Sequence, residues 1–194
     1  MTTASEQTVD QLLATRRSPY SFDPERPVAS ADLRAVFEAA RWTMSSYNEQ
    51  PWRYIVANRA SDEALWARLL GVLVEGNQAW ARYAPVLALG LYVPTFSRND
   101  KPNRAAEHDL GAASALLTVA AAARGLSVHQ MIGIEPDKAV AEFGLEGKAT
   151  PLTALAIGYA GTNPQLPDGF REREAAPRSR RTVEELLLDG GFGD

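Results

Sequence analysis

The stretch Val86–Tyr92 limits the possible folds of this chain more than any other segment. It reads VLALGLY, follows a proline, and has no polar side chain before its terminal tyrosine. A continuous apolar run of this length is typical of a strand that is buried on both faces. The chain therefore needs a β-sheet that is covered by other elements on each side.

Helical patterns supply those covering elements. The clearest begins at Ser30, interpreted as an N-cap, and places Leu33, Val36, Phe37 and Ala40 on one face. Residues 104–124 are apolar almost all round, which is typical of a buried helix or a subunit interface. Two helices precede the first strand, so we expect an α+β fold rather than a doubly wound one. The predicted helices are 8–15, 30–40, 61–74, 76–84, 104–124 and 136–144, with a short one from 182, and the predicted strands are 54–57, 86–92, 127–131 and 152–159.

Composition indicates one globular domain. The 194 residues are 45% hydrophobic and mix charges of both signs. We expect a single domain over 1–194, in which 160–194, rich in proline, glycine and charge, forms a C-terminal arm. The net charge of −4 argues against nucleic-acid or anionic-membrane partners. The sequence has no cysteine and no recognisable signal peptide or membrane span, and we expect a cytoplasmic protein.

A polar loop is expected between the second helix and the first strand, where residues 41–54 read RWTMSSYNEQPWRY. It holds two hydroxyls, Ser45 and Ser46, and two amides, Asn48 and Gln50. Short polar side chains compete for backbone hydrogen bonds, and the following proline excludes Gln50 from the α region. Loops of this kind often hold ligands, although an ordinary helix-to-strand turn has the same pattern.

Two arginine clusters indicate an anion site. Arg16 and Arg17 precede Ser18, and Arg178 and Arg180 lie in the arm within RSRR. A guanidinium is planar, permanently charged and able to bond two phosphate oxygens at once. A partly buried phosphate monoester needs more than one such partner, so the clusters could converge on one. The alternative is that both are solvated surface arginines.

Other candidate residues support no definite chemistry. Glu107, His108 and Asp109 are consecutive helix positions that cannot face one ligand together, so we interpret them as a polar helix start. The paired serines lack the G-x-S-x-G context of an esterase nucleophile, and His129 is interpreted as a structural histidine. Neither G-x-G-x-x-G nor G-x-x-x-x-G-K-[ST] occurs, and no spacing indicates a metal site.

Six segments, taken in order, resemble the FMN-dependent nitroreductase family. They are RRSPYSFD from residue 16, WTMSSYNEQPWRY from 42, GNQAWARYAP from 76, DLGAA from 109 with AAARGL at the helix end, FGLEG from 143 with PLTALAIGY from 151, and RSRR from 178. They extend from about Leu12 to Leu187. The resemblance implies an α+β fold with a central mixed or antiparallel sheet covered by helices, and an intertwined homodimer with two FMN sites at its interface.

The resemblance also implies which residues bind the cofactor. The arginines and Ser18 would hold the phosphate and ribitol, and the serines and asparagine of the polar loop would come from the partner chain, with Gln50 fixing that loop. Asn77 would meet the polar edge of the flavin ring, and Ile132 and Gly133 would lie near its reactive centre. The complete set is Arg16, Arg17, Ser18, Tyr20, Ser45, Ser46, Asn48, Asn77, Ile132, Gly133, Arg178 and Arg180.

The chain departs from the family pattern at four positions. Met44 stands where many relatives have a proline, and Ile132 where a glutamate is frequent. Tyr20 and Trp80 stand where several relatives have lysines. A cation near flavin N1 stabilises the anionic reduced ring, so the loss of these lysines should change the redox potential.

The function that the resemblance implies is an FMN-dependent NAD(P)H oxidoreductase. NADH or NADPH would deliver hydride to flavin N5, and a nitroaromatic, quinone or activated alkene would then be reduced in a ping-pong sequence, with no protein residue acting as catalyst. One alternative is another flavin reaction, such as dehydrogenation, dehalogenation or flavin destruction. The others are a flavin-binding module without turnover and a protein that binds anions through its arginines alone.

Overall fold

A four-stranded sheet forms the centre of the molecule. The structure, a computed structural model, describes residues 8–193. The strands are β1 (Trp52–Asn58), β2 (Val86–Tyr92), β3 (Ser127–Met131) and β4 (Thr150–Gly158), in the order β1-β2-β4-β3. All three pairings are antiparallel, so the sheet is not mixed. The predicted bounds of β2 and β3 are confirmed, and β1 and β4 begin two residues earlier than predicted.

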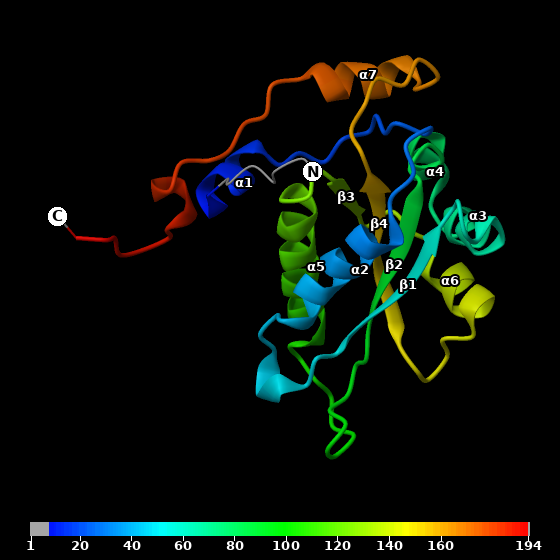
Figure 1. The fold of residues 1–194 in the computed structure, drawn as a ribbon. Coiled ribbons are helices and arrows are strands. Elements are labelled where there is room, and N and C mark those ends of the chain that lie inside the picture. Colours follow the sequence, from blue (N-terminus) through cyan, green and yellow to red (C-terminus); the bar gives the residue numbers. More distant parts are fainter. Residues whose placement is uncertain (1–7, 194) are drawn as a thin grey trace.

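Two helices cover one face of this sheet (Figure 1). They are α2 (Ser30–Arg41) and α5 (Ala106–Ala122). The predicted apolar face of α2 packs inward through Val36 and Ala40. The predicted cap at Ser30 is wrong: Ala29 is the N-cap, because its carbonyl already accepts the first helical hydrogen bond, from Leu33.

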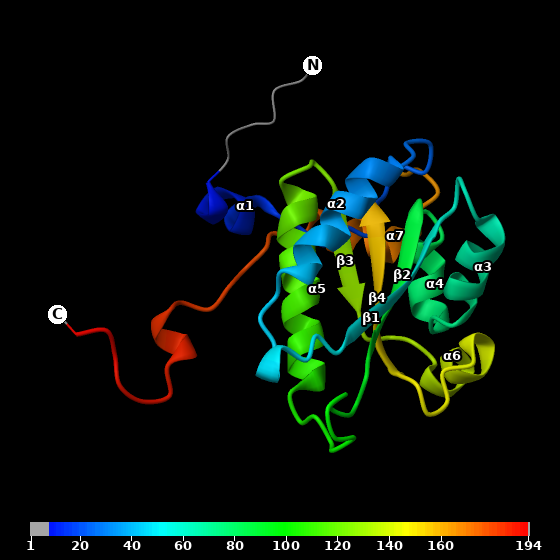
Figure 2. The ribbon, with the colours of Figure 1, turned by 60° about the horizontal axis from the view of Figure 1, so that its bottom comes forward.

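Three helices cover the opposite face, as Figure 2 shows. They are α3 (Glu63–Gly71), α4 (Glu75–Ala81) and α6 (Pro136–Phe143). Along β2, Val86 and Ala88 belong to the core under α2 and α5, whereas Leu87 and Leu89 belong to the core under α3 and α4. The strand is therefore buried on both faces, as its apolar run predicted.

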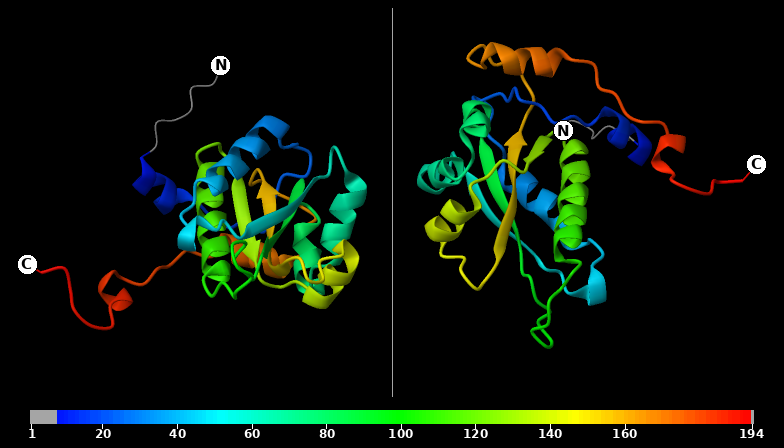
Figure 3. Two further views of the ribbon diagram at one scale, coloured as in Figure 1. Left: turned by 90° about the horizontal axis from the view of Figure 1, so that it is seen from below. Right: turned by 180° about the vertical axis from the view of Figure 1, so that it is seen from behind.

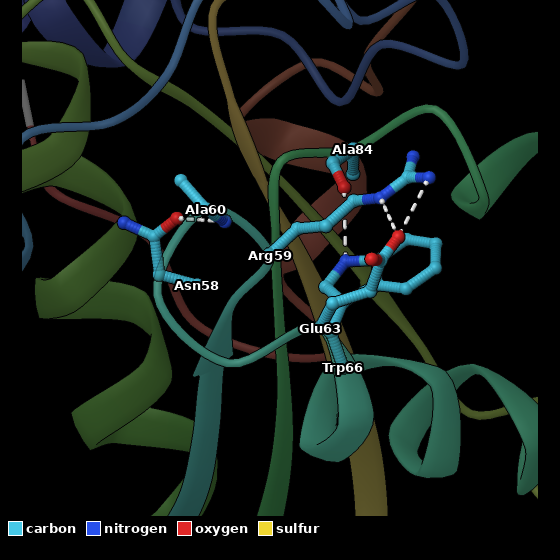
Figure 4. A network of polar contacts seen from close by, with 6 residues as sticks. All are labelled: Asn58, Arg59, Ala60, Glu63, Trp66 and Ala84. Carbon is cyan, nitrogen blue, oxygen red and sulfur yellow. Dashed lines mark hydrogen bonds and ion pairs between the residues drawn. The ribbon is translucent and has the colours of Figure 1, made fainter.

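Side chains fix the start of α3 against the sheet (Figure 4). Trp66 Nε1 donates to the carbonyl oxygen of Ala84 at 3.1 Å. Arg59 lies 4.7 Å from the Trp66 ring centroid and pairs with Glu63 at 3.2 Å. Asn58 Oδ1 accepts from the backbone N–H two residues further on at 3.2 Å, which closes the turn after β1.

The two ends of the chain lie outside these layers. Helix α1 (Val9–Thr15) begins with a reciprocal capping pair between Thr8 and Gln11, as expected for a threonine cap. Helix α7 (Asp168–Ala175) was not predicted, because it buries no residue and so shows no apolar periodicity. Beyond it, residues 176–193 are all exposed and extend away from the sheet past α1, with the short 3-10 helix η2 (Glu184–Leu186) on the way (Figure 3).

Candidate functional site

The two arginine clusters lie together at the C-terminal end of α1. Arg178 donates to the backbone carbonyls of Ala14 and Arg16, whose helical partners are missing at a helix end. Arg16 Nη2 donates to Ser18 Oγ at 3.1 Å. Arg17 donates to two backbone carbonyls at the end of α7, at 3.3 and 3.4 Å. The fold thus joins segments that are about 160 residues apart in the sequence.

The charges in this cluster are not balanced by carboxylates. Burial, followed by the charges of Arg178 and Arg180, lowers the pKa of Arg16. Within residues 8–193 no carboxylate forms an ion pair with any of these three arginines, and Arg16 Nε is buried without a hydrogen-bond partner. A cavity of about 260 Å³ adjoins Arg16 and Arg17. Convergent like charges and an unsatisfied donor fit an anion such as a phosphate.

The polar loop after α2 is held in a strained backbone conformation. Tyr47, Asn48 and Gln50 have φ values of 54°, 57° and 52°, in the left-handed region that side chains other than glycine rarely adopt. Ser45 Oγ accepts from the Gln50 backbone N–H at 3.0 Å, and Gln50 Nε2 donates to the Asn48 carbonyl at 3.1 Å. Gln50 therefore fixes the loop as predicted.

Asp109 connects this loop to α5. The residue is 3% exposed, and its carboxylate accepts from the Ser46 backbone N–H at 3.0 Å. The sequence interpretation of 107–109 as a polar helix start missed this contact. Asp109 lies four and eight residues before Ala113 and Leu117, both fully buried, so helical periodicity places it on the buried face. That spacing was the signal available in the sequence.

The loop and the arginine cluster do not meet within one chain. The loop contacts Asp109 in the first turn of α5, whereas the cavity beside Arg16 is lined by Ala122 in its last turn. At about 1.5 Å per residue, roughly 20 Å of helix separates these contacts. Figure 1 shows η1 (Ser46–Asn48) and α1 near opposite ends of α5.

Asn77 and Gly133 contact each other directly. Asn77 Nδ2 donates to the Gly133 carbonyl at 2.9 Å, and its Oδ1 accepts from Trp80 Nε1 at 3.3 Å. Both polar atoms of the amide are therefore used inside the chain. The neighbouring Ile132 side chain is 75% exposed, at the end of the edge strand β3.

The two positions at which the family resemblance implies lysines also contact each other. The rings of Tyr20 and Trp80 meet edge to face with centroids 5.2 Å apart, and His129 packs 4.8 and 4.3 Å from them. Trp80 is 1% exposed, so its position belongs to the core and is closed to a ligand. Two aromatic rings thus replace the expected cations.

Replacing Gly133 with alanine is expected to displace Asn77. A Cβ at this position would lie 2.4 Å from Asn77 Nδ2 and 2.9 Å from Val74 Cγ2. Overpacking of this kind costs about 1–3 kcal/mol, and the lost hydrogen bond adds about 1 kcal/mol. Urea unfolding should show the loss. Gly111→Ala is the matched control, because a Cβ added at Gly111 would have no atom within 4 Å, and an equal loss in both variants would contradict the expectation.

His129 is expected to make stability depend on pH. Burial lowers the pKa of His129 below 6.5, and the charge of Arg16 lowers it further. The hydrogen bond to the Pro19 carbonyl and the charge of Glu174 raise it by less. The folded state therefore resists protonation, while the unfolded chain takes up a proton near pH 6.5. Stability should be full above this pH and fall below it. The urea midpoint measured between pH 5 and 8 should depend less on pH in His129→Gln than in the parent. An unchanged pH dependence would contradict the role assigned to His129.

Another cavity of the described chain lies away from the arginine cluster. A cavity of about 690 Å³ lies between α3 and residues 162–165, and it includes none of the arginines at the α1 terminus. Within residues 8–193 no three histidine, aspartate or glutamate side chains are grouped as a metal site would require. No helix in that range has the length and apolar character needed to cross a membrane.

Comparison with known proteins decides the family. Residues 13–159 match the model of the Nitroreductase family. The chain belongs to the nitroreductase family. It is therefore an oxidoreductase, and the predicted α+β architecture is confirmed at the level of the fold.

Relatives of this nitroreductase-family protein agree along most of its length. An uncharacterised 15.4 kDa protein of Mycolicibacterium smegmatis is 32% identical over 149 residues, which are 73% of this chain and 98% of the relative. A putative NADH dehydrogenase/NAD(P)H nitroreductase of Stenotrophomonas maltophilia is 29% identical over 180 residues, 82% and 90% of the two chains. A solved oxidoreductase containing FMN superposes with a TM-score of 0.85 at 32% identity, over 97% of this chain and 95% of the other.

Proposed function

We propose that this nitroreductase-family protein is an FMN-dependent oxidoreductase that uses NADH or NADPH to reduce nitroaromatic, quinone or activated-alkene acceptors. The observation that carries the proposal is the geometry at the end of α1, where Arg178 donates to the Arg16 carbonyl and Arg16 Nε is buried without a hydrogen-bond partner. A relative of similar fold contains FMN, and others are named NAD(P)H nitroreductases, which supports this choice of cofactor and donor.

The residues at the end of α1 suit the phosphate end of the cofactor. Arg16, Arg178 and Arg180 would neutralise the phosphate, and Arg17 and Ser18 would hold the adjoining ribitol. When bound, FMN would supply the redox chemistry, accepting hydride from the nicotinamide and passing it to the acceptor in a ping-pong sequence. The protein binds and orients these groups, and no side chain is assigned a proton-transfer role.

The other proposed contacts differ in how their side chains act. Asn77 would position the Gly133 carbonyl, to which one of its amide hydrogens is donated, and would meet the polar edge of the ring with the other. Ile132 would present an apolar surface near the reactive centre, because its side chain is free to solvent in the single chain. Tyr20 would leave the nearby edge of the ring without a cation, because its ring packs on the buried Trp80.

A homodimer completes the proposed site. Ser45, Ser46 and Asn48 lie about 20 Å along α5 from the arginines of their own chain, so they would line the flavin of the partner. Large apolar side chains are exposed on α1, on the outer face of α5 and along the arm, and this exposure supports an interface with a second copy. They are Val9, Leu13, Leu116, Val183, Leu186, Leu188 and Phe192. The arm from residue 176 would therefore reach the partner subunit.

An absorbance spectrum of the purified protein tests the cofactor and the reaction together. We expect a yellow protein whose flavin bands bleach anaerobically on addition of NADH or NADPH and return with an acceptor. A colourless protein that gains no thermal stability from added FMN would refute the proposal. Bound FMN that is reduced no faster than free FMN would instead identify a binding module. A panel of nitroaromatic, quinone and alkene acceptors, with dehydrogenation and dehalogenation substrates, then separates the flavin reactions.

A further inference from the structure

The excursion between β2 and α5, residues 94–102, is an ordered hairpin-like loop. A bridge joins Thr95 to Pro102, and the Phe96 backbone N–H donates to the Lys101 carbonyl at 2.8 Å. Asp100 occupies the left-handed region at φ 56° and closes the turn by donating to the Phe96 carbonyl at 2.9 Å. The segment is therefore built to hold a definite shape rather than to cross the surface.

This excursion is joined to the polar loop after α2. The rings of Tyr47 and Phe96 meet edge to face with centroids 5.7 Å apart. The Ser97 backbone N–H donates to Glu49 Oε1 at 2.8 Å. Figure 1 places both segments at the lower end of α5. The two loops thus form one surface, although about 50 residues separate them in the sequence.

An arginine lies on the aromatic part of this surface. The Arg98 guanidinium carbon is 4.1 Å from the Tyr47 ring centroid and 5.2 Å from that of Phe96. Tyr47 is 74% exposed although it is a large aromatic residue held in a strained conformation. Among residues 8–193 no carboxylate forms an ion pair with Arg98, and the stretch 98–104 carries three cations against one aspartate.

We propose that Tyr47, Phe96 and Arg98 form a binding surface for a planar ligand that carries a carboxylate or phosphate group. An exposed ring binds planar groups by stacking, and a guanidinium without an acidic partner bonds such an anion through two parallel hydrogen bonds. The inference rests on the proposed function, in which the loop holding Tyr47 lies at the flavin of the partner subunit. Hydride donor and acceptor would then both meet Arg98, which would select the more anionic member of either class.

Two pairs of ligands that differ in charge test this inference on the FMN-loaded dimer. The acceptor pair is 4-nitrobenzoate and the neutral 4-nitrobenzamide, and the donor pair is NADPH and NADH. Arg98→Gln should lower kcat/KM for the more anionic member of at least one pair by about tenfold, the equivalent of one modest charge-assisted contact, and change the less anionic member less than about twofold. Arg98→Lys should retain part of the preference, because it keeps the charge but not the planar fork.

The matched control is Arg104→Gln, which removes the same charge from an exposed position six residues away. The dissociation constant of benzoate, read from the flavin difference spectrum, adds an equilibrium measurement. A loss confined to NADPH assigns the anion to the donor phosphate, and a loss confined to nitrobenzoate assigns it to the acceptor; either supports the surface. For each pair, the ratio of kcat/KM between the two ligands gives the charge preference. If this ratio is the same in the parent, Arg98→Gln and Arg104→Gln, the proposed surface is overturned. Protein that binds no FMN would refute the proposed function instead, so the two failures are distinct.

Discussion

Replacing Arg178 with methionine is expected to weaken FMN binding by about 100-fold. The guanidinium contributes charge beside Arg16 and holds the end of α1 through the carbonyls of Ala14 and Arg16. Hydrogen bonds to charged groups are worth about 1.5–3 kcal/mol, and about 2.7 kcal/mol corresponds to 100-fold in affinity. Fluorescence titration of the apoprotein with FMN measures the change directly.

Arg181→Met is the matched control for this prediction. It removes the same charge from the same RSRR segment, but Arg181 makes no hydrogen bond or ion pair within residues 8–193. Arg178→Lys distinguishes the effect of the positive charge from that of the two hydrogen bonds. It keeps the charge but lacks the planar guanidinium that bonds two carbonyls at once. An intermediate affinity is expected for the lysine variant. Equal losses in Arg178→Met and Arg181→Met would show that only net charge matters and would remove the anion site.

Replacing Trp80 with alanine is expected to cost about 3–5 kcal/mol of unfolding free energy. The indole is fully buried among Phe22, Tyr20 and His129, and its N–H orients the Asn77 amide. Among residues 8–193, Trp80 has the largest fully buried side chain. Its truncation therefore leaves a cavity in the core under α3 and α4. Guanidinium unfolding monitored by circular dichroism gives the loss as a lower midpoint.

Trp42→Ala provides the comparison, because Trp42 is the same residue type at 73% exposure. Substitutions at exposed positions usually change stability by less than about 0.5 kcal/mol. Trp80→Lys, which introduces the lysine that the family resemblance implies, should cost at least as much as alanine because an ammonium would be buried in an apolar core. A Trp80→Ala protein as stable as Trp42→Ala would contradict the assignment of Trp80 to the core.

The sequence predicted local elements wherever apolar side chains carried the periodicity. The bounds of β2 and β3 and the apolar face of α2 followed from such patterns. Helix α7 was not predicted because it lies on the surface and buries no residue. It is held by Glu174, whose carboxylate accepts from the backbone N–H groups of Tyr20 and Ser21 at 2.6 and 3.3 Å. A helix held mainly by polar contacts to a distant segment leaves no apolar pattern in its own residues.

The sequence indicated which residue types could form the candidate site, but not how they are arranged in space. The sequence alone determined that Arg16 and Arg178 could bind an anion, because guanidinium chemistry does not depend on the fold. Only the tertiary structure brought them together, since their contact depends on where α7 leads the arm past α1. It also enclosed Trp80 in the core, where the family pattern implies a lysine. Trp80 packs against rings from distant segments, those of Tyr20, Phe22 and His129, so the residues around it in the sequence could not decide its burial.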